Sequence, residues 1–426
     1  MTRDYRNAQA DLWYRRIIEN PAEFPFAFSY DGARFEGFPA GAFEPVSRET
    51  REEDGAQVTE LCWRHDEALF VMLRCAHYPL YGATDWIVWF ENRGTRDTGI
   101  LSDAESVLRC AGSYPTLKGI LGDHTNWYRP YALDVAASPR YFESNSGRAT
   151  HVNFPYFNLE CGDGGVMLAI GWAGTWRADF RYDRAAGETE ARLRSVNRLH
   201  TRLRPGETIR TARFAMLPYA VRNEHYAANC WRSWFINCNM PRADASGAAL
   251  APFSTCCLSG DTGLPNSDGS ISERCFTWRP SLEKMIAEDV KVDFRWFDAG
   301  WYVAPDLSSP ESDWWGTVGT WTLDPAKWPG DSFRESTDFT RAHGMRTLMW
   351  FEPERVTDPD SLAKNFGYNP EWAIRREGVK AISNNIGNPD CFRWTVDRIK
   401  KTLSDNHVDM YREDNNSDQA GLWNYL

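Results

Sequence analysis

Acidic side chains stand at the ends of three apolar runs in the second half of the chain. The run DFRWFD ends at Asp298, TLMWFEPE ends at Glu352 and Glu354, and VDMYRED ends at Glu413 and Asp414. Carboxyl groups held close together can divide the roles of nucleophile, general acid and general base between them. A single such residue would more simply cap a helix or pair with a basic neighbour, but three runs that share the pattern favour an active site.

The chemistry expected of these carboxyl groups needs no metal. No HExxH, P-loop or GxGxxG motif follows a predicted strand, and the eight histidines are scattered. We therefore expect no metal site and no cofactor. Paired Asp or Glu side chains that work without a metal are typical of glycoside hydrolases. The 20 tryptophans fit sugar binding but are equally common as core residues, so their number alone decides nothing.

The elements that must position these residues alternate between helix and buried strand. Helical patterns cover 280–290, 331–344 and 388–406, and strands are predicted at 290–298, 345–354 and 408–414. Ser332 and Glu335 have the spacing of a capping box, and Phe392, Val396, Ile399 and Leu403 have helical spacing. Alternating helices and strands predict a parallel sheet, either a barrel or a doubly wound sheet. In a (β/α)8 barrel the C-terminal strand ends form the catalytic face.

The first half of the chain has a different pattern of apolar and polar residues. Between about residues 20 and 220, short apolar or alternating runs are separated by turn signals such as NRG at 92–94 and RPGE at 204–207. This pattern predicts an antiparallel β-sandwich. We expect a sandwich domain at 1–222, a helical linker and connecting segment at 223–272, and an α/β domain at 273–426.

Composition limits the partners. Fifty-nine acidic and 48 basic residues give a formal net charge of -11, which disfavours nucleic acid. No apolar run approaches the roughly 20 residues of a membrane span, and the charged N-terminus is unlike a secretory signal. The ten cysteines show no zinc-like grouping and are expected to be free thiols in the cytoplasm. Whether the chain forms a homo-oligomer stays open.

Several motifs resemble glycoside hydrolase family 36, the bacterial α-galactosidases. In the second half they are WFDAGWY at 296–302, GTW at 319–321 followed by KWPG, MWFEPERV at 349–356 and MYREDNN at 410–416. In the first half FENRGTRDTGIL, NFPYFNLECGDGGVMLAIGWAGTW and LHTRLRPGETIRTARF look like that family's N-terminal β-sandwich. The resemblance implies an N-terminal antiparallel β-sandwich followed by the first half of a (β/α)8 TIM-type barrel.

The resemblance also implies roles for single residues. Asp414 matches the nucleophilic aspartate of a retaining mechanism on terminal α-linked galactose, and Asn416 matches an asparagine near the sugar 2-position. Arg412 occupies the place of a basic residue that holds sugar hydroxyls. Asp298 matches one of two adjacent aspartates that hold the 4- and 6-hydroxyls, and Trp321 matches an aromatic wall of the pocket. Glu352 and Glu354 are expected to hold these side chains in position without contacting the sugar themselves.

Two departures from the family pattern matter. Ala299 stands where the second aspartate is expected, which puts the preference for galactose in doubt. The segment from 273 to 426 has roughly 150 residues, whereas a complete barrel takes about 250. The family's acid/base aspartate lies beyond the nucleophile, so the sequence is expected to be a fragment that is inactive by itself. An α-N-acetylgalactosaminidase, an α-galactosyl transglycosylase and a non-catalytic truncated sugar-binding protein remain alternatives.

Overall fold

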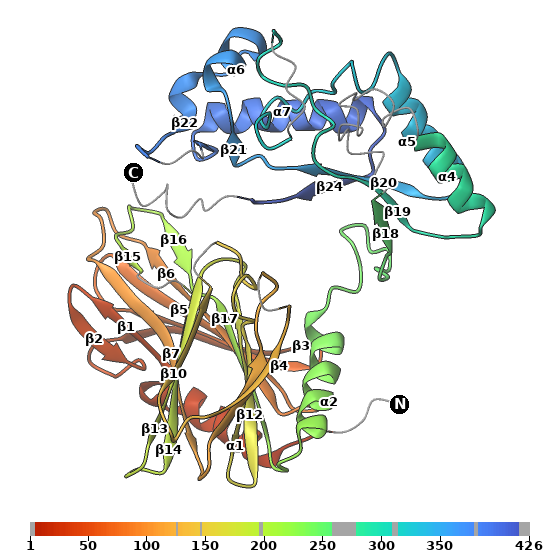
Figure 1. Ribbon diagram of the computed structural model, residues 1–426. Coiled ribbons are helices and arrows are strands. Elements are labelled where there is room, and N and C mark those ends of the chain that lie inside the picture. Colours follow the sequence, from red (N-terminus) through yellow and green to blue (C-terminus); the bar gives the residue numbers. More distant parts are fainter. Residues whose placement is uncertain are drawn as a thin grey trace. The chain divides into compact units, whose positions relative to one another are not determined.

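The computed structural model describes residues 5–124, 127–144, 147–195, 199–257, 278–308, 314–378 and 382–416. The chain forms two compact units, Met1–Pro241 and Arg242–Leu426, which are described separately (Figure 1). Within the described residues, no helix is long and apolar enough to cross a membrane. Every cysteine described is a free thiol.

The first unit contains two antiparallel sheets. The described strands of the smaller sheet follow the order β10-β13-β14-β7-β1-β2, with β15 paired to β7. Their bounds are β1 Phe26–Tyr30, β2 Ala33–Glu36, β7 Leu101–Ala111, β10 Arg140–Ser144, β13 Trp176–Asp183, β14 Glu188–Arg194 and β15 His200–Thr201.

The larger sheet follows the order β3-β4-β5-β6-β17-β12-β11-β8-β9, with β16 paired to β6. The predicted antiparallel sheets of the first half are thus confirmed. The bounds are β3 Glu44–Glu53, β4 Ala56–Arg64, β5 Leu69–Tyr78, β6 Ala83–Asn92, β8 Thr116–Ile120, β9 Pro130–Asp134, β11 Tyr156–Cys161, β12 Gly164–Gly171, β16 Thr208–Arg210 and β17 Arg213–Tyr219.

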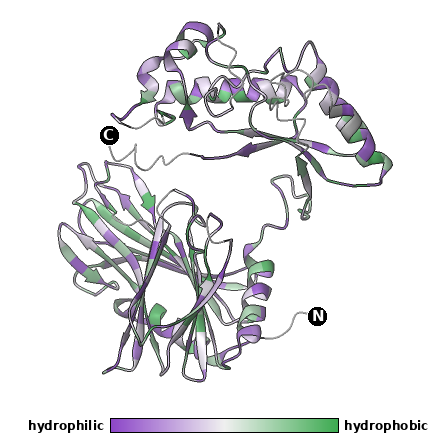
Figure 2. Ribbon diagram, viewed as in Figure 1, coloured by the Kyte–Doolittle hydropathy of each residue, from purple (hydrophilic) through white to green (hydrophobic). Residues whose placement is uncertain are grey.

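The strands form because apolar residues alternate with polar ones. In β14, Thr189, Ala191 and Leu193 are buried while the residues between them are partly exposed, as expected for a sheet with one face on a core. Phe28 and Trp176 are fully buried in the main apolar cluster of the unit. Figure 2 shows hydrophobic residues interspersed with hydrophilic ones along these strands.

Two helices pack on the first unit. Helix α1 (Ala8–Glu19) has Asn7 at its N-cap, and the Asn7 side chain accepts a hydrogen bond from the Gln9 amide at 3.1 Å. Helix α2 (Glu224–Trp234) continues into the π-helix η2 (Phe235–Asn239), and Trp231 and Trp234 are buried in an apolar cluster with strand residues. The segment predicted as a linker from residue 223 therefore begins with a helix that is part of the sandwich unit. A 3-10 turn, η1, covers Pro21–Glu23.

The second unit contains a four-stranded parallel sheet in the order β18-β19-β20-β24. Figure 1 shows α4, α5 and α7 along one face of this sheet. A small antiparallel sheet, β21-β23-β22, lies in the same unit. The bounds are β18 Thr255–Cys257, α4 Trp278–Ala287, β19 Phe294–Phe297, α5 Ser332–Ala342, β20 Arg346–Phe351, β21 Arg355–Val356, α6 Pro359–Phe366, η4 Pro370–Trp372, β22 Ala373–Ile374, β23 Ile382–Asn384, α7 Pro389–Asp405 and β24 Met410–Glu413.

The second unit differs from the sequence expectations at three places. Strand β18 lies inside the stretch predicted to be a connecting segment, where a three-residue strand carries too little pattern to be recognised. Helix α5 has Asp331 at its N-cap without a side-chain cap, so the predicted capping box is wrong. In α7 Phe392 is 53% exposed, while Thr395 and Thr402 are buried. Both threonine hydroxyls make hydrogen bonds, which an apolar pattern does not reveal.

Candidate active site

The register of the parallel sheet brings the predicted site residues together. Phe297 of β19 pairs with Met349 of β20, and Met349 pairs with Tyr411 of β24. The residues that follow these three, Asp298, Trp350 and Arg412, are therefore level with one another at the C-terminal edge. Glu352 and Asp414 continue on the same face, because side chains two positions apart in a strand point to the same side.

The opposite face of the sheet packs on helices. Arg295 of β19 is 1% exposed, and its guanidinium donates hydrogen bonds to the hydroxyl groups of Ser336 and Thr340 of α5. Because Arg295 alternates with Trp296 along the strand, the face that carries Trp296 and Asp298 is the one turned away from α5. The polar residues at the strand ends thus lie on the face that α5 does not cover.

Asp414 accepts hydrogen bonds from three sides. Oδ2 accepts from Nε1 of Trp350 at 2.8 Å and from Nδ2 of Asn416 at 3.1 Å, and Oδ1 accepts from the Asn415 amide at 3.0 Å. Nη1 of Arg412 lies 3.4 Å from Oδ2. Burial opposes ionisation, but the Trp350 hydrogen bond and the Arg412 charge outweigh it, so the pKa of Asp414 is lower than usual. Asp414 is thus an ionised, oriented carboxylate, as a nucleophile requires.

Glu352 is a buried support for the segment after β24. Its side chain is 0% exposed, and Oε2 accepts hydrogen bonds from Nε and Nη2 of Arg355 at 2.9 and 2.7 Å. Oε1 accepts from the backbone amide of Asn416 at 2.7 Å. Both oxygens are therefore engaged by protein donors. This geometry favours the predicted supporting role over direct contact with a ligand.

Glu354 and Glu413 have different surroundings. Glu413 is exposed, and its Oε2 accepts a hydrogen bond from the Tyr411 hydroxyl at 2.7 Å. Glu354 is half-buried, and its Oε2 lies 3.4 Å from Nδ2 of Asn415. Burial, followed by the charges of Glu413 and Glu352, raises the pKa of Glu354 above its ordinary value. The surroundings of Glu354 therefore favour its protonated form.

Arg412 lies between Trp296 and Asp414. Its guanidinium is 4.7 Å from the centre of the Trp296 ring, a cation–π contact. Nη1 of Arg412 and Nε1 of Trp296 are both buried and have no hydrogen-bond partner in the described part of the chain. These two donors could bind a ligand oxygen. Sequence reasoning missed Trp296, although its position two residues before Asp298 places it on the same face.

Asp298 and Trp321 differ in accessibility. Asp298 is half-buried, and its Oδ1 accepts a hydrogen bond from the Ala299 amide at 2.9 Å. Trp321 is 1% exposed and packs against Tyr302 and Phe351, with ring centres 5.5 Å apart in each case. Trp321 is therefore a core residue in this structure. Its predicted position on the wall of a sugar pocket requires an exposed face that the packing does not leave.

A cavity of about 1030 Å³ in the sandwich unit is lined by residues between Asn7 and Ala220 and includes none of the predicted site residues. Among the residues described, no group of three His, Cys, Asp or Glu side chains could hold a metal ion.

No protein-family model matches this chain, and no curated protein matches it. Solved structures do. The chain covers 54% of the galactosidase domain of an α-galactosidase–sucrose kinase, at 16% identity and a TM-score of 0.66. It covers 52% of an α-galactosidase from Lactobacillus brevis, at 13% identity and a TM-score of 0.66. It covers 54% of a GH36 α-galactosidase from Geobacillus stearothermophilus in complex with raffinose, at 14% identity and a TM-score of 0.65.

Each of these matches includes 91% of the present chain. The likeness shows the fold: the predicted resemblance to GH36 α-galactosidases is confirmed at that level. The chain spans about half the length of the solved structures that it matches.

Proposed function

We propose that this chain is part of a retaining glycoside hydrolase that cleaves terminal α-linked galactose. The observation that carries the proposal is the position of Asp414, an ionised carboxylate at the C-terminal end of a parallel strand, held by Trp350 and Asn416. The four-stranded sheet would then be the first half of a (β/α)8 barrel, whose catalytic residues lie at such strand ends. The shared fold with GH36 α-galactosidases, one of them with raffinose bound, supports the substrate class.

In this proposal Asp414 attacks the anomeric carbon and forms a covalent glycosyl-enzyme, which water then hydrolyses. Each step inverts the anomeric centre once, so the configuration is retained. Arg412 and Trp296 would donate hydrogen bonds to sugar oxygens through Nη1 and Nε1, which are buried and make no hydrogen bond within the described residues. Asp298 would accept from sugar hydroxyls, and Asn416 would both orient Asp414 and contact the sugar.

The second carboxyl group of a retaining enzyme lies roughly 5 Å from the nucleophile, where it protonates the leaving oxygen. Glu352 is engaged by Arg355 and the Asn416 amide, and Glu413 is exposed. The family resemblance assigns this role to an aspartate downstream of Asp414. The complete protein would therefore be needed for turnover.

The decisive experiment replaces Asp414 by Ala in the protein extended by its natural downstream sequence. Turnover of an aryl α-galactoside should fall by about 10⁴-fold or more, and azide or formate should partly restore it. Glu413→Ala is the matched control, since it removes an exposed carboxylate from the same strand. Near-normal turnover by the Asp414 variant would reject the nucleophile.

The stereochemistry and metal dependence test the mechanism. NMR of the first-formed sugar should show the α-anomer, and EDTA should leave the rate unchanged, because two carboxyl groups suffice for this reaction. The β-anomer formed first would contradict a double displacement. Faster release from an aryl α-N-acetylgalactosaminide, or net transfer to a second sugar, would favour the corresponding alternative. Binding without turnover would favour a sugar-binding protein.

A further inference from the structure

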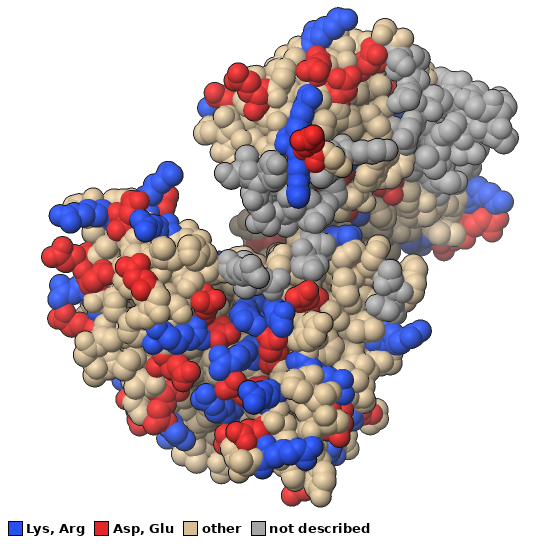
Figure 3. All heavy atoms as spheres, turned by 60° about the vertical axis from the view of Figure 1, so that its left-hand side comes forward, with Lys and Arg blue, Asp and Glu red and all other residues tan. Residues whose placement is uncertain are grey.

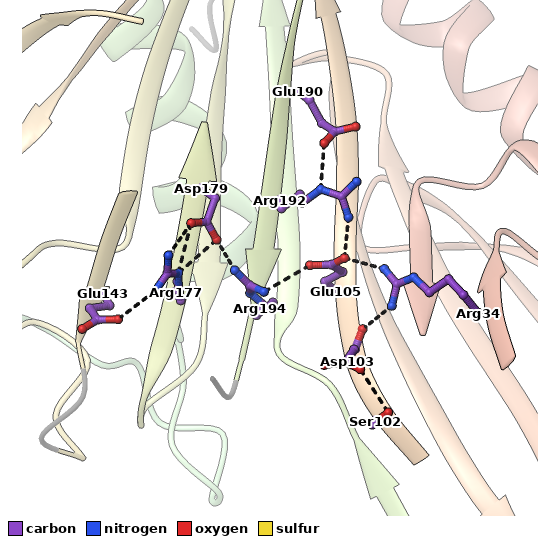
Figure 4. Close-up of polar contacts among 10 residues, drawn as sticks. All are labelled: Arg34, Ser102, Asp103, Glu105, Glu143, Arg177, Asp179, Glu190, Arg192 and Arg194. Carbon is purple, nitrogen blue, oxygen red and sulfur yellow. Dashed lines mark hydrogen bonds and ion pairs between the residues drawn. The ribbon is translucent and has the colours of Figure 1, made fainter. Parts of the chain in front are cut away.

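The outer face of the smaller sandwich sheet carries a network of ion pairs. Figure 3 shows acidic and basic side chains interspersed over the sandwich unit, and Figure 4 shows the network itself. Glu105 of β7 has a side chain only 5% exposed, and it accepts hydrogen bonds from Arg34 and, at 2.7 Å, from Nη1 of Arg192. Asp179 of β13 pairs with Arg194 and, at 2.8 Å, with Arg177. The network fixes the positions of these planar guanidinium groups.

A groove of about 450 Å³ runs beside this network. Its lining includes Tyr141 of the edge strand β10, whose side chain is 66% exposed. The guanidinium of Arg177 lies 4.9 Å from the centre of the Tyr141 ring. Because one face of the ring is covered by this arginine, the exposure is on the other face and the ring edge. The groove thus offers an open aromatic surface whose orientation is already fixed.

The groove carries an excess of positive charge. Arg140, Arg177, Arg181 and Arg192 line it, against Asp179 and Glu190. Both carboxylates are already neutralised: Asp179 by Arg177 and Arg194, and Glu190 by Arg192 at 2.7 Å and Arg109 at 3.1 Å.

One arginine of the groove, Arg181, is free to bind an anionic group. Arg181 is exposed and has no carboxylate within ion-pair distance in the part of the chain described. Arg140 precedes Tyr141 in β10 and pairs with the buried Phe180, so its side chain lies on the opposite face of the sheet, where Nη2 donates to the Asp134 carbonyl at 3.2 Å. Arg181 lies two residues after Asp179, which pairs with Tyr141, so it is on the same face as the exposed ring.

We propose that this groove binds an anionic saccharide, a pyranose chain bearing carboxylate or sulfate groups. A pyranose ring can stack on the open face of Tyr141, and the fixed guanidinium and carboxylate groups can hydrogen-bond its hydroxyls. Arg181 supplies the charge for the acidic substituent, since a guanidinium matches a carboxylate or sulfate through paired hydrogen bonds. A volume of about 450 Å³ falls in the range of small-molecule sites.

The proposal is independent of the proposed catalytic function, because binding can be measured without turnover. Calorimetric titration of residues 1–426 with α-1,4-linked trigalacturonate should show binding, while neutral maltotriose should bind at least about tenfold more weakly. Tyr141→Ala and Arg181→Gln should each weaken trigalacturonate binding by about tenfold. Tyr141→Phe keeps the ring and should retain wild-type affinity. Asp414→Ala should also leave this affinity unchanged, which separates the groove from the candidate active site.

Three results would overturn the proposal. The first is an absence of binding both to trigalacturonate and to a sulfated galactose trisaccharide. The second is an affinity that neither Tyr141→Ala nor Arg181→Gln changes, with the fold of each variant verified by its melting temperature. The third is equal affinity for triglutamate or inorganic sulfate, which would make the groove an acidic-peptide or simple anion site.

Discussion

The buried pair of Glu352 and Arg355 gives the most direct test of how the candidate site is supported. The side chains are 0% and 3% exposed, and Nη2 of Arg355 lies 2.7 Å from Oε2 of Glu352. Glu352→Gln keeps an acceptor oxygen for the Asn416 amide but removes the negative charge that compensates the guanidinium. The variant therefore isolates the cost of an uncompensated buried charge.

Breaking a buried ion pair on one side costs about 3 to 5 kcal/mol. We expect the lower end, about 3 kcal/mol, because Arg355 keeps two other contacts. Its Nη1 donates to the Trp315 carbonyl at 2.7 Å, and its guanidinium lies 4.2 Å from the centre of the Trp315 ring. Glu413→Gln, which alters an exposed carboxylate, should change stability by less than about 0.5 kcal/mol.

Hydrogen exchange followed by mass spectrometry can measure this loss locally, because it reports the opening free energy of the peptides that contain β20 and β24. The double variant Glu352→Gln/Arg355→Met also removes the guanidinium that has lost its carboxylate partner. It should therefore recover at least half of the lost opening free energy. If these peptides are as well protected from hydrogen exchange in the Glu352→Gln variant as in the wild type, the Glu352–Arg355 ion pair does not support the site. If the double variant is worse than the single one, uncompensated charge is not the cause.

The remaining predictions concern the same edge of the sheet. Trp350→Phe removes a donor from Asp414 and should raise its lowered pKa. The ionised Asp414 carboxylate stabilises the fold at pH values above the pKa that Asp414 has in the unfolded chain. This contribution is lost as the pH falls through the lower pKa of the folded state. The variant should therefore be less stable by about 1 to 2 kcal/mol at pH 7, with a smaller deficit at pH 3; equal deficits would contradict this. Ala299→Asp in the extended protein should raise the ratio of aryl α-galactoside to aryl α-glucoside hydrolysis by about tenfold, and an unchanged ratio would reject the role of that position. Residues 1–426 alone should not turn over an aryl α-galactoside; turnover that Glu354→Gln abolishes would instead identify Glu354 as the acid.

Much of this site could be predicted because parallel strands share a direction. Once DFRWFD, TLMWFEPE and VDMYRED are recognised as parallel strands, their last residues must meet at one edge, whatever the details of packing. Asp298 and Asp414 therefore required no knowledge of tertiary contacts. The contrast between the two halves was likewise visible, since short alternating runs and long helical periods are local features.

The features that the sequence did not reveal depend on distant partners. The Trp321 ring is buried against Tyr302 and Phe351. The backbone carbonyl of Trp321 accepts a hydrogen bond from the Thr402 hydroxyl of α7 at 2.6 Å. The buried face of α7 includes Thr395, which accepts a hydrogen bond from Nδ2 of Asn384 at 3.0 Å. A hydroxyl group satisfied in this way can be buried, while Phe392 on the same helix stays exposed. Only the tertiary structure determines which of these residues is covered.

The pattern of paired and unpaired donors separates support from binding at this edge. Leaving a buried donor without a partner costs about 1 to 3 kcal/mol, so a group with a purely structural task is normally satisfied. Arg355 meets that rule, because its described donors reach Glu352 and the Trp315 carbonyl. Trp296 Nε1 and Arg412 Nη1 make no hydrogen bond among the residues described. Arg412 Nη1 reaches only the Asp414 carboxylate, as an ion pair at 3.4 Å, and the Arg412 guanidinium lies over the Trp296 ring. A ligand whose oxygen atoms accept hydrogen bonds would remove the cost at both donors at once, and a sugar ring next to Asp414 meets that requirement.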